Sequence, residues 1–467
     1  MALRADLTPY LRGPAEYPPE WRWQKWLRPV GRAAIPALAC AVTLIALVPL
    51  TATAAARRHP RRAAWLVLVL ASLFGYGLDL AALRFAPRGI HNRLRDRTLS
   101  ANVTSFFTVA TWPEARDPRV FLRDHASLLE GYVTSARHAA THPPGPVLYE
   151  RAVLAFFEAC PGLTARLAET PSPHDVEVAH KPHYARPTPV EMVASIVSPL
   201  LLPFFCVLTV WPLASLARSA GAEPLAAARL GVLWCLVPGA VLMTPTIDQA
   251  LALPVTAAIA CLAAAMTSER HASTLTVAGG LLGGLALFFS YGAAAFLDVG
   301  GIAALALGWG RPDWPRRALL TTAIATAAAA AVFAVPAIFG GHPLAAARTA
   351  LRIHDVEYTA PRSYALWLLF NPLDLALFLG APFVVLCAAR RRGSDATHRL
   401  RLATLAGVAV LLLSGSVRGE IGRIWVPLMP LLLVAALGDH RDHREATVVA
   451  TLMAALVLAI GLSWGVP

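Results

Sequence analysis

Five arginines in two polar stretches near the end of this 467-residue sequence are suited to binding an anion: Arg348, Arg352, Arg362, Arg418 and Arg423. Guanidinium groups bind phosphate oxygens in a bidentate fashion and stay charged when they are partly desolvated. As a set, these side chains predict an anion site. The alternative for any one of them is an ordinary loop charge that contacts lipid headgroups.

Carboxylates in the polar segment 87–189 are candidates for moving a proton. A side chain such as Asp117 or Asp96 is able to take a proton from an acceptor hydroxyl group. Asp117 also directly precedes Pro118 and the helical pattern Arg119–Leu129, so capping of a helix is a serious alternative for this residue.

His138 and His142 lie four residues apart and would share one face of a helix. Two histidines without a third ligand make a poor metal site, so we expect them to have a structural role or to position a substrate, and we predict no metal ligands. A requirement for a divalent cation is left open. The stretch Thr141-His142-Pro143-Pro144-Gly145-Pro146 that follows predicts a chain break and the start of a new helix.

The elements that must hold these residues are membrane helices. The chain is 57% hydrophobic and only 15% charged, and it contains repeated apolar runs such as Ala33–Ala55, Ala63–Leu83, Val190–Leu213, Leu230–Thr244, Ala250–Met266 and Thr447–Leu462. Runs of this length match the bilayer core when they are helical. We therefore predict an all-α polytopic membrane protein with about twelve transmembrane helices.

The net charge of +13 does not indicate nucleic acid, because the basic residues fall in short bursts between the apolar runs. These bursts are Arg57–Arg62, Arg311–Arg317, Arg390–Arg401 and Arg441–Arg444. Short loops rich in arginine face the cytoplasm. The expected location is thus a bacterial-type cytoplasmic (inner) membrane, with the anion site on the outside and membrane lipids around it.

Counting spans from these loops divides the chain into four parts. Residues 1–32 form an interfacial segment, 33–86 the first two transmembrane helices, 87–189 a large extracytoplasmic loop with juxtamembrane helices, and 190–467 the remaining helices with an outer loop at 340–371. The run Val147–Cys160 is too short and too charged to span, so it predicts an amphipathic helix in the interface, with Pro143 and Pro144 in its first turn. Because residues 1–32 also fall outside, one further helix could precede this sequence.

Three short motifs resemble the GT-C superfamily of integral-membrane glycosyltransferases, which includes the protein O-mannosyltransferases and the aminoarabinose transferases of lipid A. His142-Pro143-Pro144-Gly145 is similar to the His/Lys-Pro-Pro element of that superfamily, and Leu236-Val237-Pro238-Gly239 followed by Asp248 to a later Ser-Pro…Asp element. Glu420-Ile421-Gly422-Arg423-Ile424-Trp425 resembles a Glu-x-x-Arg-x-Trp turn.

The resemblance implies transfer of a sugar, with inversion, from a polyprenyl-phosphate donor to an acceptor of the cell envelope, which is a glycan, a lipid or a protein. Together with the histidine pair and the arginine set, these motifs predict a substrate site made by His138, His142, Asp248, Arg362, Glu420 and Arg423. The base would be an acid of the first outer loop. Asn102–Phe107 lacks the expected acidic pair, so Asp117 is the first choice, Asp96 the second and Asp124 the third. The alternatives are a transporter or flippase of lipid-linked precursors and a catalytically inactive relative.

Overall fold

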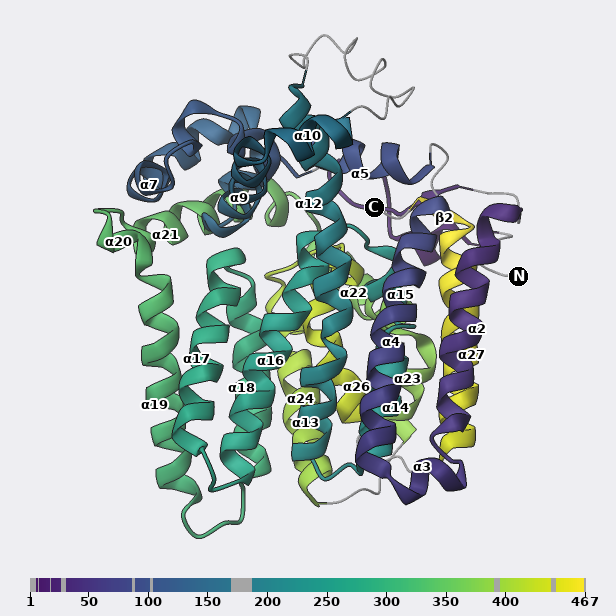
Figure 1. Ribbon diagram of the computed structural model, residues 1–467. Coiled ribbons are helices and arrows are strands. Elements are labelled where there is room, and N and C mark those ends of the chain that lie inside the picture. The colour runs from purple at the N-terminus through teal and green to yellow at the C-terminus, as the bar shows by residue number, and fades with distance from the viewer. Residues whose placement is uncertain are drawn as a thin grey trace.

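The computed structural model describes residues 6, 8–16, 18–26, 31–85, 89–100, 104–168, 187–389, 395–437 and 442–465. Within these ranges the chain is helical except for turns and one short antiparallel pair, β1 (Gln24–Lys25) with β2 (Trp464–Gly465). The predicted all-α class is confirmed (Figure 1).

Seven helical stretches in the described part of the chain are long and apolar enough to cross a membrane, which indicates an integral membrane protein. They are α4 (Pro60–Ala82), α12 with α13 (Pro189–Leu208 and Val210–Ser219), α16 (Ile247–Thr267), α17 (Ala272–Phe289), α19 (Trp314–Phe333), α24 (Asp395–Ser414) and α27 (His443–Gly461). Shorter apolar helices lie among them: α2 (Ile35–Leu50), α14 (Pro224–Trp234), α18 (Ala293–Leu307), α22 (Tyr364–Leu379) and η6 with α26 (Val426–Leu428 and Met429–Leu437).

A second set of helices covers one end of this bundle, and we call it the capping layer (Figure 1). It consists of α5 (Gly89–Leu99), α6 (Phe106–Ala110), α7 (Pro118–Ser135), α8 (Arg137–Ala140), α9 (Gly145–Ala159), α10 (Pro161–Ala168), α20 (Val335–Ile338) and α21 (Pro343–His354). The layer has an apolar core of its own, built on buried side chains such as Phe107, Phe121 and Leu154. The arginine-rich helix α3 (Ala54–Arg58) lies at the opposite end of the bundle.

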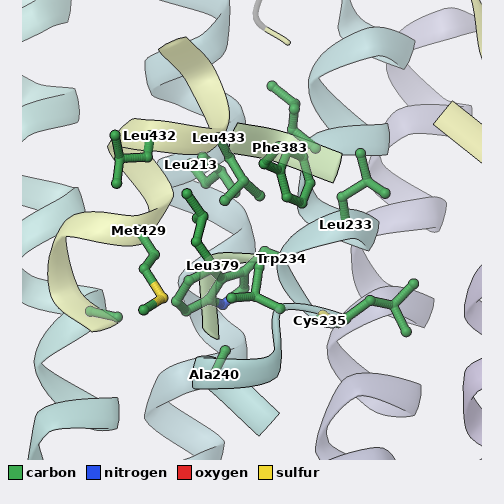
Figure 2. Packing of buried hydrophobic residues seen from close by; sticks show 14 of the residues in the cluster. Leu213, Leu233, Trp234, Cys235, Ala240, Leu379, Phe383, Met429, Leu432 and Leu433 are labelled. Atoms are coloured by element: carbon green, nitrogen blue, oxygen red, sulfur yellow. The ribbon is translucent and has the colours of Figure 1, made fainter. Parts of the chain in front are cut away.

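The bundle is held by close contacts between apolar side chains of distant segments. Figure 2 shows Trp234 among residues from several helices: Leu213, Leu233, Leu379, Phe383, Met429, Leu432 and Leu433. The indole N–H of Trp234 donates to the carbonyl oxygen of Cys206 over 3.0 Å, so its polar atom is satisfied inside the bilayer zone. Gly280 and Gly284 let α17 approach α19, because an added Cβ would lie 2.4 and 2.7 Å from the backbone oxygens of Ala325 and Ala329.

One apolar run predicted as a single span is divided between two helices. A span was expected at Leu230–Thr244, but α14 ends at Trp234 and the short α15 (Pro238–Leu242) follows, with Pro238 in its first turn, where the missing N–H of proline costs no hydrogen bond. Arg229 is buried within α14.

The two prolines expected in the first turn of the juxtamembrane helix precede it instead. Helix α9 begins at Gly145, so that Pro144 is its N-cap residue and Pro146 occupies the first turn. The predicted amphipathic helix itself is present as α9 and lies in the capping layer (Figure 1). The segment 340–371, expected as an outer loop, forms α21, the π-helix η5 (Asp355–Thr359) and the start of α22.

Candidate functional site

The turn that carries Glu420 and Arg423 is held in an uncommon conformation by helix α22. Gly419 and Glu420 both have positive φ angles, of 95° and 58°, directly before the short helix α25 (Ile421–Ile424). Asn371 Oδ1 accepts a hydrogen bond from Gly419 N over 3.1 Å, and Asp374 Oδ2 accepts one from Gly422 N over 2.8 Å. A left-handed glutamate persists only where its surroundings fix it, and these two buried side chains do so.

Four charged side chains form a network on this turn. Arg423 Nη2 lies 2.8 Å from Glu420 Oε2, and Arg423 Nη1 lies 3.3 Å from Asp248 Oδ2. Arg362 Nη2 lies 3.3 Å from Glu420 Oε1. The four side chains are between 6% and 20% exposed, so their attraction is screened less than on an open surface. Two positive and two negative charges balance within the network.

Two guanidinium groups at this turn have charge or hydrogen-bonding capacity that the described residues do not fully meet. The Nε atom of Arg423 is buried and has no hydrogen-bond partner among the described residues. Arg418 Nη1 donates to the backbone carbonyl oxygens of Thr359 and Arg362, over 3.1 and 2.6 Å, and its guanidinium lies over the ring of Tyr364. In the described part of the chain no carboxylate pairs with Arg418, so its positive charge is not balanced locally.

Neutral histidines of the capping layer border the network. Burial, together with the charge of Arg423, lowers the pKa of His138 to about 3, and burial lowers the pKa of His142 to about 4. The Nδ1 atom of His142 lies 2.8 Å from the carbonyl oxygen of His138 and therefore carries the proton, which leaves Nε2 as an acceptor. Burial also lowers the pKa of His354, and the ring of Tyr358 lies 5.7 Å from that of His354 and 6.1 Å from that of His138.

The carboxylate of Glu420 is the ionised centre of the cluster. Burial alone would raise its pKa, but the positive charges of Arg423 and Arg362 outweigh burial and hold the pKa below the ordinary value. Glu420 therefore stays negative and keeps both guanidinium groups in place.

The structure brings together all six residues predicted to bind substrate. Asp248, Arg362, Glu420 and Arg423 are joined by ion pairs, and His138 and His142 are close enough for the charge of Arg423 to alter their pKa. Arg348 and Arg352 are not part of the network. Arg352 is exposed and pairs with Glu130 on α7 over 2.6 Å.

Two of the acids predicted as bases, Asp117 and Asp124, are not part of this network. Asp117 is exposed and caps α7, where its side chain accepts a hydrogen bond from Arg119 N over 2.8 Å. Asp124 accepts hydrogen bonds from Nε and Nη2 of the neighbouring Arg123, each over 2.8 Å, and its side chain is 40% exposed. Asp96 belongs to α5, but its side chain lies outside the described residues.

Four residues of the site were not assigned from the sequence: His354, Tyr358, Asn371 and Asp374. Asn371 and Asp374 had an available signal, because two polar side chains three positions apart in the apolar run Tyr364–Leu379 must share one face and find partners. His354 and Tyr358 lie four apart, but nothing in that spacing connects them with Arg423.

Across the described ranges, no group of three or more His, Cys, Asp or Glu side chains is arranged to hold a metal ion. Comparisons with known proteins find no matching family model, no matching curated protein and no matching solved structure.

Proposed function

We propose that this chain is an integral-membrane glycosyltransferase that transfers a sugar from a polyprenyl-phosphate donor to a cell-envelope acceptor, a glycan, a lipid or a protein. The observation that carries the proposal is the network of Arg362, Glu420, Arg423 and Asp248, which joins the ends of apolar helices to the neutral histidines of the capping layer. An amphiphilic substrate with one phosphate fits such a boundary, since its tail stays in lipid while its phosphate meets the guanidinium groups.

The donor phosphate would bind Arg423 through its unpaired Nε atom, with the charge of Arg418 nearby. When the sugar is transferred, the bond between its anomeric carbon and the phosphate oxygen breaks, and the phosphate keeps the electron pair. A fixed guanidinium stabilises the negative charge that develops on this leaving group. Glu420 would hold the guanidinium for that task.

The acceptor hydroxyl group must lose its proton as its oxygen bonds to the anomeric carbon. Asp248, in the first turn of α16, is the carboxylate of the network best suited to receive this proton, because Glu420 is engaged by two arginines and Asp248 by one. Asp248 thereby replaces Asp117 as our first choice for the base.

For the arrangement in the membrane, we propose twelve spans, with the five shorter apolar helices added to the seven long ones. The support is their position beside the long helices in one bundle (Figure 1). The arginine-rich end, marked by α3, would face the cytoplasm and the capping layer the outside, in a bacterial-type cytoplasmic membrane.

A transporter of lipid-linked precursors is the second candidate, and one observation favours it. Asp79 is buried within α4 and accepts a hydrogen bond from Gln249 Nε2 over 3.4 Å, and buried polar groups of this kind mark transport pathways.

The experiment uses purified protein in nanodiscs, a panel of polyprenyl-phosphate sugars and cell-envelope acceptors. Release of polyprenyl phosphate with sugar on the acceptor supports the enzyme. Movement of labelled lipid between leaflets without transfer would support the transporter and overturn the enzyme.

A further inference from the structure

The N-terminal residues 8–16 and 18–26, here called the N-terminal strap, are anchored against the rest of the chain. Trp23 is 2% exposed, and its backbone N–H donates to Arg12 O over 2.8 Å while Arg12 Nη1 donates back to Trp23 O over 2.6 Å. Strand β1 of the strap pairs with β2 at the other end of the chain, on the side of the capping layer (Figure 1). The strap is thus closed on itself by Arg12 and Trp23, and β1 ties its end to β2.

Two buried carboxylates connect the strap to the charged network. Asp374 accepts from Trp23 Nε1 through one oxygen and from Gly422 N through the other, each over 2.8 Å. Glu20 accepts from Ser363 N over 2.8 Å and from Trp367 Nε1 over 2.6 Å. Each carboxylate therefore joins the strap to a backbone position next to an arginine of the network, since Gly422 precedes Arg423 and Ser363 follows Arg362.

We propose that Glu20 and Trp23 are positioning residues for the anion site, which act on Arg362 and Arg423 through Ser363 and Asp374. This inference rests on the proposed function for its ligand. The turn at Gly419 and Glu420 has positive φ angles and keeps them only while its partners stay in place.

The physical reason is that a buried carboxylate needs both of its oxygens satisfied. If Trp23 loses its indole N–H, Asp374 Oδ1 is left without its donor, and the carboxylate shifts or takes up a proton to compensate. Either change weakens its hold on Gly422 N. A pocket lined by Arg12, Trp23, Asp374 and Glu420 lies between the strap and the turn, so the turn is not fully packed on this side.

Trp464 supplies a matched control for Trp23. Both indole rings pack against the ring of Phe378 in tilted contacts, with centroid distances of 5.2 Å for Trp23 and 6.4 Å for Trp464, and both are nearly fully buried. The indole N–H of Trp464 has no hydrogen-bond partner in the described part of the chain. Trp23→Phe and Trp464→Phe thus remove similar apolar area, but only Trp23→Phe removes a donor to Asp374.

The test compares wild type, Trp23→Phe and Trp464→Phe in nanodiscs by hydrogen–deuterium exchange without ligand and by the affinity for a long-chain polyprenyl monophosphate. We expect faster exchange of the amides in residues 417–424 and about tenfold weaker binding in Trp23→Phe alone. Equal exchange in residues 417–424 in the two variants would overturn the inference, whatever the ligand does. If residues 417–424 exchange faster in Trp23→Phe alone, as expected, but wild type does not bind the lipid, the proposed function is overturned and the positioning role remains.

A second variant guards against misfolding of Trp23→Phe. Glu20→Gln keeps the shape of the side chain and one acceptor oxygen. The other oxygen becomes an NH₂ group, so one of the two donors, Ser363 N or Trp367 Nε1, loses its charged acceptor. It should also speed exchange near residues 417–424 and weaken lipid binding. Protection equal to wild type in this variant would remove Glu20 from the positioning role.

Discussion

Arg423 and Asp248 are separated by 175 residues, and their side chains meet with Nη1 of the arginine 3.3 Å from Oδ2 of the aspartate. The same guanidinium pairs with Glu420 over 2.8 Å. One cation therefore lies between two largely buried carboxylates, one at the start of α16 and one before α25. Without that cation the two negative charges would face each other with little water to screen them, so Arg423 is the residue on which the whole network depends.

The first prediction concerns the orientation in the membrane. Arg119, exposed on α7 of the capping layer, and Arg61, exposed beside α3, lie toward opposite ends of the bundle. With the native cysteines replaced by alanine, Arg119→Cys should react with a membrane-impermeant maleimide added to intact cells, and Arg61→Cys should react only after lysis. The reverse pattern would place the capping layer in the cytoplasm.

The second prediction concerns the glycine of the Pro143-Pro144-Gly145-Pro146 stretch. A Cβ at Gly145 would lie 2.2 Å from the backbone oxygen of Phe288, so the capping layer touches the end of α17 with no room for a side chain. Gly145→Ala should lower the melting temperature by several degrees. Gly131→Ala on α7 is the control, because a Cβ there meets nothing within 4 Å and alanine favours the helix. Equal melting temperatures of the two variants would show that Gly145 is not a tight contact.

Stability should fall as the pH falls below neutral. Burial lowers the pKa of His125 to about 4, although its hydrogen bond to the carbonyl of His142 opposes this, and in the unfolded chain the value is near 6.5. Between these values the unfolded state binds a proton that the folded state refuses, so the stability from the neutral ring is complete above about pH 6.5 and is lost toward pH 4.

His125→Gln should flatten this dependence when melting temperatures are compared at about pH 7 and about pH 5. Burial raises the pKa of Glu150 to about 7, which gives a slope of opposite sign, but that slope is common to both proteins and cancels in the difference. An unchanged slope in His125→Gln would mean that this histidine does not titrate as stated.

The choice of base gives a prediction about transfer. Asp248→Asn should lower the transfer rate by at least about a hundredfold, since general base catalysis contributes about 10²–10⁴. Asp117→Asn should leave it nearly unchanged, because asparagine caps a helix as well as aspartate does. Full loss of transfer in Asp117→Asn with a folded protein would restore Asp117 as the base.

The sequence was sufficient for those features that depend on the bilayer. An apolar run of spanning length has few alternatives to a membrane helix, and α4, α16 and α27 were accordingly predicted within a few residues. The charged run Val147–Cys160 was predicted as a helix outside the bilayer core for the same reason, and α9 confirms the helix.

The site was harder, because its contacts depend on packing between distant segments. Glu420 was assigned through a short motif and a family resemblance. His138 and His142 were paired by their spacing, and Arg423 was one of several candidate arginines, but no pattern showed that these residues meet. The contact of Trp23 with Asp374 spans 351 residues, and no local pattern announces it. Asp117 is the opposite case, because its local sequence indicated a helix cap and the structure shows that capping hydrogen bond, from Arg119 N to the Asp117 side chain.

The most direct test of the account is the affinity of folded protein in nanodiscs for a long-chain polyprenyl monophosphate, with the matching polyprenol as the uncharged control. Wild type should bind the phosphate and not the alcohol, Arg423→Gln should bind it at least about tenfold more weakly, and Arg352→Gln, which alters only an exposed pair with Glu130, should bind like wild type. Equal affinity of all three proteins for the phosphate, or equal affinity of wild type for phosphate and alcohol, would contradict the assignment of Arg423 as the residue that holds the donor.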